Sequence, residues 1–480
     1  MFILYLVFMV GIGFYFFLRS KGANEKDYFL GGRKMGPWVS ALSAGASDMS
    51  AWVLMGLPAS VFAAGMGQTW IAIGLAVGYA LSWIFEAPRL RRFSIEANDS
   101  ITIPQYLTNR FLSKSKALQI ICAVIFIFAY TIYAASSIKA CGTLFNTVIG
   151  MDATAAMYLA AAIIIGYTFL GGFSAVCWTD FFQGLLMLAA LLVAPIFAMA
   201  LVNSSTASVV EQLPEHYWSF TRDWREIASG LGWGLGYFGM PHIIIRFMSV
   251  KSQKDLRKSS VIGISWTVII LVMSVAAGAV GRVMSSHGII EITDSSTVFI
   301  QMTRSIFPAL ISGILLSAIL AASMSTADSQ LLASASAFAS DVYKPVFRKN
   351  ASDKEMLWAG RVVVMIIAVI ALLIASDPNS GSIMGLVENA WGVFGAAFGP
   401  TIMLSLFWRR LTFGGAVAGI VGGALTDVLW LVCLKSTGLY EIIPGFAVGL
   451  IAAIVVSLIT PAPGKDVDAL FTRATGKEAE

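Results

Sequence analysis

Residues 44–50 read AGASDMS and are followed closely by GLP at residues 56–58, within an apolar run over residues 37–64. A second apolar run, residues 226–248, is interrupted in a comparable way by Gly232, Gly234, Gly236, Gly239 and Pro241. Glycine, serine and proline break a membrane helix there, and the freed backbone groups must line a protein-enclosed site because lipid offers them no hydrogen bonds. The two runs predict a pair of broken helices around a site near the middle of a bilayer.

The composition places the chain in a membrane. The 480 residues are 58% hydrophobic and only 12% charged, whereas a soluble chain carries about 25% charged residues. The 44 glycines and 13 tryptophans suit helices that span lipid rather than short alternating strands. The four cysteines have no CxxC spacing, so we interpret them as small buried residues rather than as disulfide or zinc ligands. We expect an all-α integral membrane protein.

Apolar stretches long enough to cross a bilayer, at about 20 residues each, recur along almost the whole chain. The pattern predicts thirteen transmembrane helices. They cover residues 2–18, 37–64, 67–87, 117–147, 153–170, 180–202, 226–248, 260–281, 306–340, 357–375, 384–407, 412–434 and 441–459.

The distribution of lysine and arginine predicts the orientation. Alternate loops hold 26 of the 32 basic residues, and these are residues 19–34, 89–116, 246–258, 344–361, 409–410 and 465–477. Basic loops stay in the cytoplasm. The N-terminus is therefore expected outside and the C-terminus inside, which requires an odd number of spans and agrees with thirteen.

The two broken helices are separated by five spans, and an odd offset reverses the direction of the chain through the bilayer. This is the arrangement of two inverted repeats of five helices each. The predicted organisation is a first helix with a cytoplasmic loop (1–36), a first repeat (37–203), a second repeat (204–408) and two last helices with a short tail (409–480).

Several motifs then point to one family. The stretch at residues 44–58 resembles the second span of the sodium/solute symporter family, within it the proline-transporting branch. Four further blocks agree in the same order: 171–180, 233–242, 321–330 and 394–400. The resemblance implies a LeuT-type core of ten helices in 5+5 inverted repeats, with one helix before it and two after it.

The resemblance also implies a sodium site. Sodium needs hard oxygen ligands, which backbone carbonyls of an unwound helix and side-chain hydroxyls supply. By similarity to the family, the proposed ligands are the carbonyls of Ala46, Met49 and Ala322 and the hydroxyls of Ser325 and Thr326. The alternative is that Ser325 and Thr326 merely bond back to their own helix.

Carboxylates inside a bilayer are functional candidates because burying one there costs at least about 2.5 kcal/mol. Asp48 lies in the first break and matches a carboxylate linked to sodium affinity in the family. Asp180 either caps a helix at the interface or joins Asp328 and Ser329 in a second ion site, which some family members have. Asp48 and Lys139 are further candidates for that second ion site or for a charge pair with these residues. A salt bridge or a proton-binding carboxylate would give the same pattern.

Lys139 departs from the family pattern, which usually has a small apolar residue there. We consider three interpretations: a lysine that snorkels to the outer interface, a partner for a buried aspartate such as Asp328, or a contact for a substrate carboxylate. They predict different behaviour when the ammonium is removed.

The substrate site is expected between the broken helices. An amino acid needs N–H groups for its carboxylate, carbonyls for its ammonium and aromatic walls for its apolar body. Ala51 and Met240 stand where proline carriers often have glycine and glutamine. The candidates are Ser50, Trp52, Gly56, Tyr133, Trp233, Tyr237 and Pro241, and for the last four the resemblance implies substrate binding.

The resemblance implies a symporter of the bacterial cytoplasmic membrane that uses Na⁺ to import a small amino acid, with L-proline as the expected substrate. The alternatives are a proton-coupled carrier of another amino or carboxylic acid, and a transporter-like nutrient sensor. We expect no nucleic-acid partner and no obligate protein partner. An enzyme is not expected, because the three histidines lack metal spacing and no GxSxG motif occurs.

Overall fold

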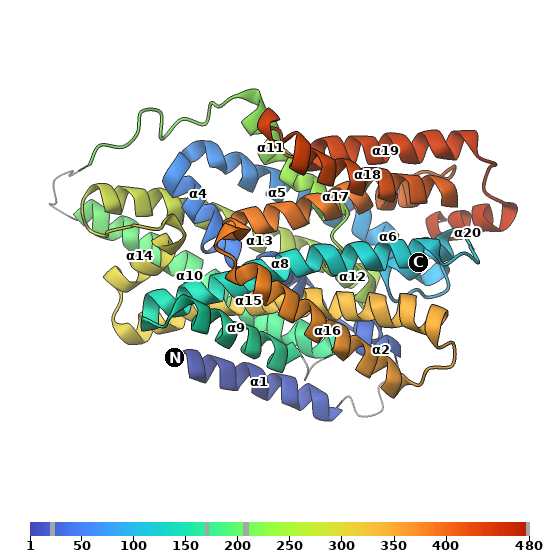
Figure 1. The fold of residues 1–480 in the computed structure, drawn as a ribbon, viewed down its shortest axis with the longest axis horizontal. Helices are drawn as coiled ribbons and strands as arrows, with labels where there is room; N and C mark the ends of the chain where they lie inside the picture. Colours follow the sequence, from blue (N-terminus) through green and yellow to red (C-terminus); the bar gives the residue numbers. More distant parts are fainter. Residues whose placement is uncertain (20–24, 169–171, 205–210, 477–480) are drawn as a thin grey trace.

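The computed structural model describes residues 1–19, 25–168, 172–204 and 211–476. Within these ranges the chain is built from helices, and the pairing of extended backbone is limited to one isolated bridge between Met35 and Val250. Figure 1 shows the long helices side by side, most of them running along the long axis of the molecule. The expectation of an all-α fold is confirmed.

Nine helical segments among the described residues are long and apolar enough to span a bilayer. Each corresponds to one predicted span. They are Met66–Glu96 (η3 Met66–Gln68, α5 Thr69–Leu81, η4 Ser82–Glu86 and α6 Ala87–Glu96), α8 (Ala117–Ile149), α10 (Phe173–Ser204), α13 (Gln253–Ser286), Ala309–Phe347 (α15 Ala309–Ser336 and η7 Ala337–Phe347), α16 (Asp353–Ser376), α17 (Ile383–Phe407), α18 (Phe413–Cys433) and α19 (Ile442–Ile459).

The other four predicted spans are two apolar helices and two broken ones. The apolar helices are α1 (Phe2–Arg19) and α9 (Ala153–Thr168). The first broken helix consists of α3 (Pro37–Asp48), η2 (Ala51–Val53) and α4 (Gly56–Ala64), and the second of α11 (Trp224–Gly232), η5 (Trp233–Phe238) and α12 (Pro241–Ser249). Both interruptions fall where the sequence predicts them.

Short elements connect the spans. They are α2 (Glu25–Leu30), η1 (Gly31–Arg33), α7 (Ile103–Arg110), η6 (Ser295–Thr297), α14 (Val298–Ile306), η8 (Pro378–Ser380), η9 (Lys435–Thr437) and α20 (Lys465–Thr475).

Two boundaries differ from the sequence prediction and matter for the site. Helix α10 begins at Phe173, so Asp180 lies inside the helix and is fully buried, and its interpretation as a helix cap is wrong. Arg246 belongs to α12 and is 1% exposed, although the charge count assigned it to a cytoplasmic loop. Gly171 of the second motif, residues 171–180, lies outside the described residues.

Close packing holds the broken helices in place. Helix α3 contacts α10, α13 and α15, and η5 contacts α5 and α17. A Cβ on Gly78 would come within 2.2 Å of the Gly234 carbonyl oxygen, so α5 can approach η5 this closely only because no side chain intervenes. The structure therefore places both breaks deep inside the helix bundle.

Candidate functional site

The proposed sodium ligands converge at the end of the first half of the broken helix. The Ala46 carbonyl, near the end of α3, accepts from the Ser325 hydroxyl at 2.8 Å and from the Thr326 hydroxyl at 3.5 Å, both on α15. Ser325 Oγ also lies 3.2 Å from the Ala322 carbonyl oxygen. These four residues are fully buried. Their oxygens form one cluster that bridges α3 and α15.

Met49 lies at the break itself, with ψ at 73°, outside the helical range. Its N–H donates to the Gly45 carbonyl. Among the described turn and cap hydrogen bonds, none is donated to the Met49 carbonyl. The residue next to it, Ser50, is extended, and its hydroxyl accepts from the Trp52 N–H at 3.5 Å. The unwound backbone thus presents a carbonyl that the helix does not use.

Asp48 connects the two broken helices. The hydroxyl of Tyr237, in η5, donates to Asp48 Oδ2 at 2.6 Å. The Asp48 carbonyl oxygen accepts from Trp52 Nε1 at 3.2 Å and from the Tyr133 hydroxyl, on α8, at 3.3 Å. Asp48 is fully buried, and its Oδ1 has no hydrogen-bond partner. Asp48 therefore forms one polar and aromatic group with three of the substrate candidates, Trp52, Tyr133 and Tyr237.

The same contacts correct one grouping. The sequence analysis placed Asp48 with Asp180 and Asp328, but the hydrogen bonds of Asp48 lead to Tyr237, whereas Asp180 bonds to Ser43 and Arg246. The positions on α3 explain this, because Ser43 lies more than one turn before Asp48, toward the start of the helix.

Aromatic rings cover the other side of Tyr237. Trp391 of α17 packs edge to face on Tyr237 at 5.1 Å between ring centroids, and its indole N–H donates to the Trp233 carbonyl at 2.8 Å. Tyr440 lies 5.2 Å from Trp233. All four rings are at most 3% exposed. Trp391 and Tyr440 were missed by the sequence analysis, because a lone aromatic residue in a membrane helix most often only packs.

Gly56 and Pro241 stand at the starts of the second half-helices. Gly56 begins α4, and a Cβ there would lie 3.2 Å from Trp52 Cβ, in tight contact. Pro241 begins α12 and is followed by His242, whose N–H donates to the Tyr130 hydroxyl at 3.0 Å and whose Nε2 lies 3.1 Å from the Ser47 carbonyl oxygen. His242 is thus a buried link between α12, α8 and α3.

A second polar cluster centres on Arg246. Its guanidinium donates to Asp180 Oδ2 at 3.1 Å, to Ser329 Oγ at 2.6 Å and to Ser43 Oγ at 3.1 Å. Ser43 Oγ donates to the same Asp180 oxygen at 2.6 Å, and Ser329 Oγ lies 3.4 Å from Asp328 Oδ1. Asp180 Oδ1 and Asp328 Oδ2 have no partner. The cluster holds two buried carboxylates around one arginine.

The sequence analysis brought Asp180, Asp328 and Ser329 together correctly but missed Arg246. A signal was present, since Arg246 follows Pro241 by little more than one helical turn and so belongs to an apolar helix rather than a loop. A basic residue there, like a buried carboxylate, needs a partner inside the protein.

Lys139 contacts neither carboxylate cluster. Its ammonium donates to Ser380 Oγ at 3.0 Å and to the Gly381 carbonyl at 2.5 Å, in the connection between α16 and α17. The proposed pairing with Asp328 is therefore wrong, because the ammonium is bonded to this connection instead. The flexible lysine side chain extends from α8 to this connection, as a snorkelling lysine would.

We expect Lys139→Met to change uptake by less than about fivefold, since a charged contact at a partly exposed position contributes about 0–1 kcal/mol. The measurement is initial uptake rate at matched expression. A loss of more than tenfold would instead give the ammonium a direct part in transport.

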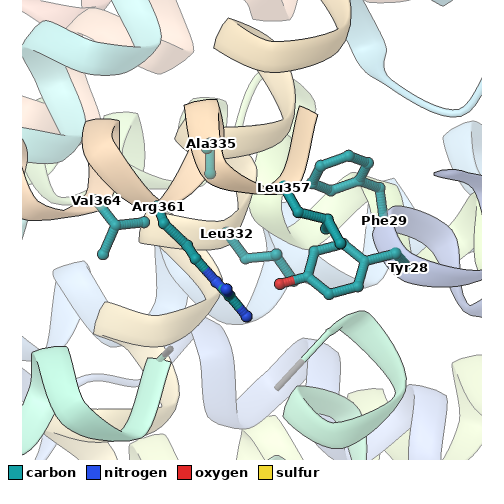
Figure 2. Close-up of a pocket in the computed structure, with 8 residues that line it drawn as sticks. Tyr28, Phe29, Leu332, Ala335, Leu357, Arg361 and Val364 are labelled. Atoms are coloured by element: carbon teal, nitrogen blue, oxygen red, sulfur yellow. The ribbon is translucent and has the colours of Figure 1, made fainter. Parts of the chain in front are cut away.

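A small pocket near α2 lies apart from these clusters. Figure 2 shows Tyr28 and Arg361 beside Leu332 and Leu357 at this opening, between α2, α15 and α16. Its volume of about 20 Å³ accommodates little more than one water molecule. The pocket is too small for an amino acid.

Comparison with known proteins identifies the family. The model of the sodium:solute symporter family matches residues 28–423. The chain belongs to this family. It is similar to the high-affinity proline transporter PutP of Bacillus subtilis (42% identity over 467 residues, 96% of this chain and 98% of the relative). It is also similar to the osmoregulated proline transporter OpuE of the same organism, at 44% identity over 474 residues, with 98% and 96% covered.

A third relative is the sodium/proline symporter of Staphylococcus aureus strain USA300, which is 43% identical over 477 residues and covered to 93%. Among solved structures, a Na⁺-coupled sialic acid symporter in a substrate-bound outward-open state aligns with a TM-score of 0.80 at 20% identity, covering 96% of this chain and 98% of the other. Mhp1, a nucleobase-cation-symport-1 family transporter, aligns at 0.57 over 92% of this chain and 97% of the other, at 14% identity.

These structures share the fold with this chain. The core is therefore of the LeuT type, as the sequence predicts, and the family makes the chain a multi-pass membrane transporter coupled to Na⁺.

Proposed function

We propose that this chain imports L-proline together with Na⁺ across the cytoplasmic membrane of a bacterium. Relatives that match almost its full length at 42–44% identity are proline transporters by name. The observation that carries the proposal is the cluster of Ala46, Ala322, Ser325 and Thr326 oxygens between a broken helix and α15, which offers Na⁺ a dry set of hard ligands.

The carbonyl of Met49 completes the proposed ion site. The Ser325 hydroxyl donates to the Ala46 carbonyl, which brings the two proposed ligand oxygens within 2.8 Å of each other. An ion between them would turn the hydroxyl around and accept lone pairs from both oxygens. Because the site joins α3 to α15, sodium binding favours whichever state of the transporter brings these helices together.

The substrate is proposed to bind beside Asp48. Proline has a secondary ammonium, a carboxylate and an apolar ring, and these need acceptors, donors and a hydrophobic wall. The carboxylate and carbonyl of Asp48 are acceptors, the hydroxyls of Ser50, Tyr133 and Tyr237 are donors, and Trp52 and Trp233 supply the wall. Gly56 and Pro241 begin the second half-helices, beside the two breaks.

The buried positions of these side chains imply that they separate to admit the substrate. Ser50, Trp52, Tyr133, Trp233 and Tyr237 are at most 3% exposed. Rocking of one inverted repeat against the other would open the outer and inner paths in turn. The repeats are proposed to be residues 37–203 and 204–408, each opening with one of the broken helices, flanked by 1–36 and 409–480.

The proposed orientation puts the N-terminus outside and the C-terminus in the cytoplasm, because basic loops alternate along the chain. Arg246 belongs to a helix and no longer counts as a loop residue. The loop that follows it is still basic, because it contains Lys251, Lys254, Arg257 and Lys258, so the orientation is unchanged.

The Arg246 cluster supports a second cation-binding site. Asp180 accepts from Arg246, Asp328 is linked to the same arginine through Ser329, and each carboxylate keeps one oxygen without a partner. A second Na⁺ or a proton would neutralise the remaining charge. Uptake of labelled proline into proteoliposomes, with sodium and proton gradients imposed separately, tests which ion drives transport, and uptake driven by a proton gradient alone would contradict sodium coupling.

Ser325→Ala and Thr326→Ala should each raise the sodium concentration for half-maximal uptake by about tenfold or more. A contact between a hydroxyl and a charged group contributes about 1.5–3 kcal/mol. Uptake across a sodium titration measures this. Ser323→Ala is the matched control, because Ser323 is equally buried on α15 and makes no hydrogen bond to Ala46. Unchanged sodium dependence in both variants would place the ion elsewhere.

A further inference from the structure

Helices α5 and α6 pack along α13, and this line of contact is called the seam. Two arginines line a cavity at one end of it. The cavity has a volume of about 330 Å³. Arg92 of α6 and Arg257 of α13 line it. The remaining lining residues are Trp83, Ile84, Pro88, Gln253, Leu256 and Ser260.

These two guanidiniums differ from their neighbours in being uncompensated. Arg89 donates to the Leu406 carbonyl, and Arg91 donates to the carbonyls of Val250 and Lys251. Within the part of the chain that the structure describes, Arg92 and Arg257 make no side-chain hydrogen bond or ion pair, and the Nε of Arg92 is buried without a partner. The cavity thus offers two positive charges to an anion.

An apolar groove continues along the same seam. It lies between α5 and α13, has a volume of about 490 Å³, and is lined by Ala72, Ala76, Val77, Val268, Val272 and neighbouring residues. Val77 is 51% and Val272 58% exposed, so the groove faces outward from the bundle. Exposed apolar side chains also lie at the cavity itself, with Ile84 of its lining at 53% and Val261, next to Ser260 of its lining, at 66% exposure.

The spacing fits one leaflet of a bilayer. Arg257 and Val268 are separated along α13 by about 16 Å, at about 1.5 Å per residue. This is about half of the hydrocarbon thickness of about 30 Å. An acyl chain attached to a head group at Arg257 would therefore end in the groove. The positive end belongs to the basic loops, which places it at the cytoplasmic face in the proposed orientation.

We propose that this seam binds an anionic phospholipid of the cytoplasmic leaflet, with its phosphate between Arg92 and Arg257 and one acyl chain in the groove between α5 and α13. Basic pockets between membrane helices on the cytoplasmic side suit such head groups. A soluble phosphate matches the charge of the cavity but leaves the groove unfilled, and the combination of the two features selects the lipid.

The position of the seam connects the lipid to transport. Helix α5 packs on α11 and η5, and α13 packs on α3 and α4, so the two helices of the seam hold both broken helices. A Cβ on Gly45 would come within 2.6 Å of the Trp266 ring, which shows how closely α13 approaches the first break. A lipid bound to the seam moves with these helices, and its removal should slow uptake as well as lower stability.

Binding is tested first, independently of any transport assay. Purified transporter in detergent is titrated with phosphatidylglycerol or phosphatidylcholine, and retained lipid is counted by native mass spectrometry. Arg92→Gln and Arg257→Gln should each weaken phosphatidylglycerol binding about fivefold, and the double variant about thirtyfold. Lys258→Gln is the matched control, because it removes a neighbouring exposed charge that does not line the cavity.

The groove is tested separately. Val272→Trp fills it and should lower retention of phosphatidylglycerol about tenfold, whereas Val362→Trp, at a similarly exposed position on α16 outside the groove, should not. Three outcomes would overturn the proposal. They are phosphatidylcholine binding as tight as that of phosphatidylglycerol, a loss of binding in Lys258→Gln as large as in the two arginine variants, and inorganic phosphate alone binding as tightly as the lipid. Because these readouts need no substrate, they can fail while sodium-driven proline uptake stands, and the reverse also holds.

Discussion

Arg246→Gln is expected to abolish transport and to destabilise the folded protein by about 3–5 kcal/mol, because it leaves a buried carboxylate without its partner. Arg246 and Asp180 are both at most 1% exposed and lie 3.1 Å apart. The same guanidinium ties α12 to Ser43 on α3 and to Ser329 on α15. With Asp180 on α10, the guanidinium joins four helices, and its loss therefore loosens all four contacts at once. The measurements are thermal unfolding of the purified variant in detergent and uptake at matched expression.

The double variant Arg246→Gln with Asp180→Asn separates charge from packing. Removing both charges is far less costly than removing one, so the double variant should regain most of the lost stability. Arg225→Gln, at an exposed position, is the control for removing any arginine. An Arg246→Gln protein that unfolds at the parental temperature and transports normally would contradict the assigned role of the cluster.

Tyr237→Phe is expected to weaken proline binding by about 10-fold to 150-fold while sodium binding without proline persists. The hydroxyl donates to Asp48 Oδ2 at 2.6 Å, and a hydrogen bond to a charged group contributes about 1.5–3 kcal/mol. Without it neither oxygen of the Asp48 carboxylate has a partner, since Oδ1 already has none. Among the described residues, the hydroxyl of Tyr237 bonds to Asp48 and not to the proposed sodium ligands, so the ion site should stay intact.

The measurement is binding of radiolabelled proline at saturating sodium, beside binding of ²²Na⁺ in the absence of proline. Tyr79→Phe is a closely matched control, because Tyr79 packs on Tyr237 at 5.1 Å and its buried hydroxyl makes no hydrogen bond. Normal proline affinity in Tyr237→Phe would move the substrate away from Asp48. Loss of sodium binding as well would mean that the two sites are not separate.

The broken helices could be predicted from sequence because their cause is local. Glycine and proline at residues 232–241, and the polar stretch at 44–50, prevent a continuous helix whatever surrounds them. The breaks at Met49 and Gly239 then fall where the sequence places them. The convergence of Ala46, Ala322, Ser325 and Thr326 was not local, and it was anticipated only because the motifs resemble those of the family.

The interactions of charged residues could not be predicted in the same way. Hydropathy treats Arg246 and Lys139 alike, as basic residues near apolar runs. In the structure one lies at the centre of a buried cluster and the other reaches a loop. The difference depends on which helices pack against each residue. Those neighbours are far apart in the chain, so the spacing of residues in the sequence does not predict them.

The sequence by itself determined that the chain is a helical membrane protein with thirteen apolar segments, two of them broken, since low charge, hydrophobic length and helix-breaking residues act along the chain. Only the tertiary structure decided that Tyr237 bonds to Asp48, that Arg246 bonds to Asp180, and that Trp391 and Tyr440 cover Trp233. A buried polar group must find a partner in space, and the partner is fixed by how helices pack rather than by their order in the chain.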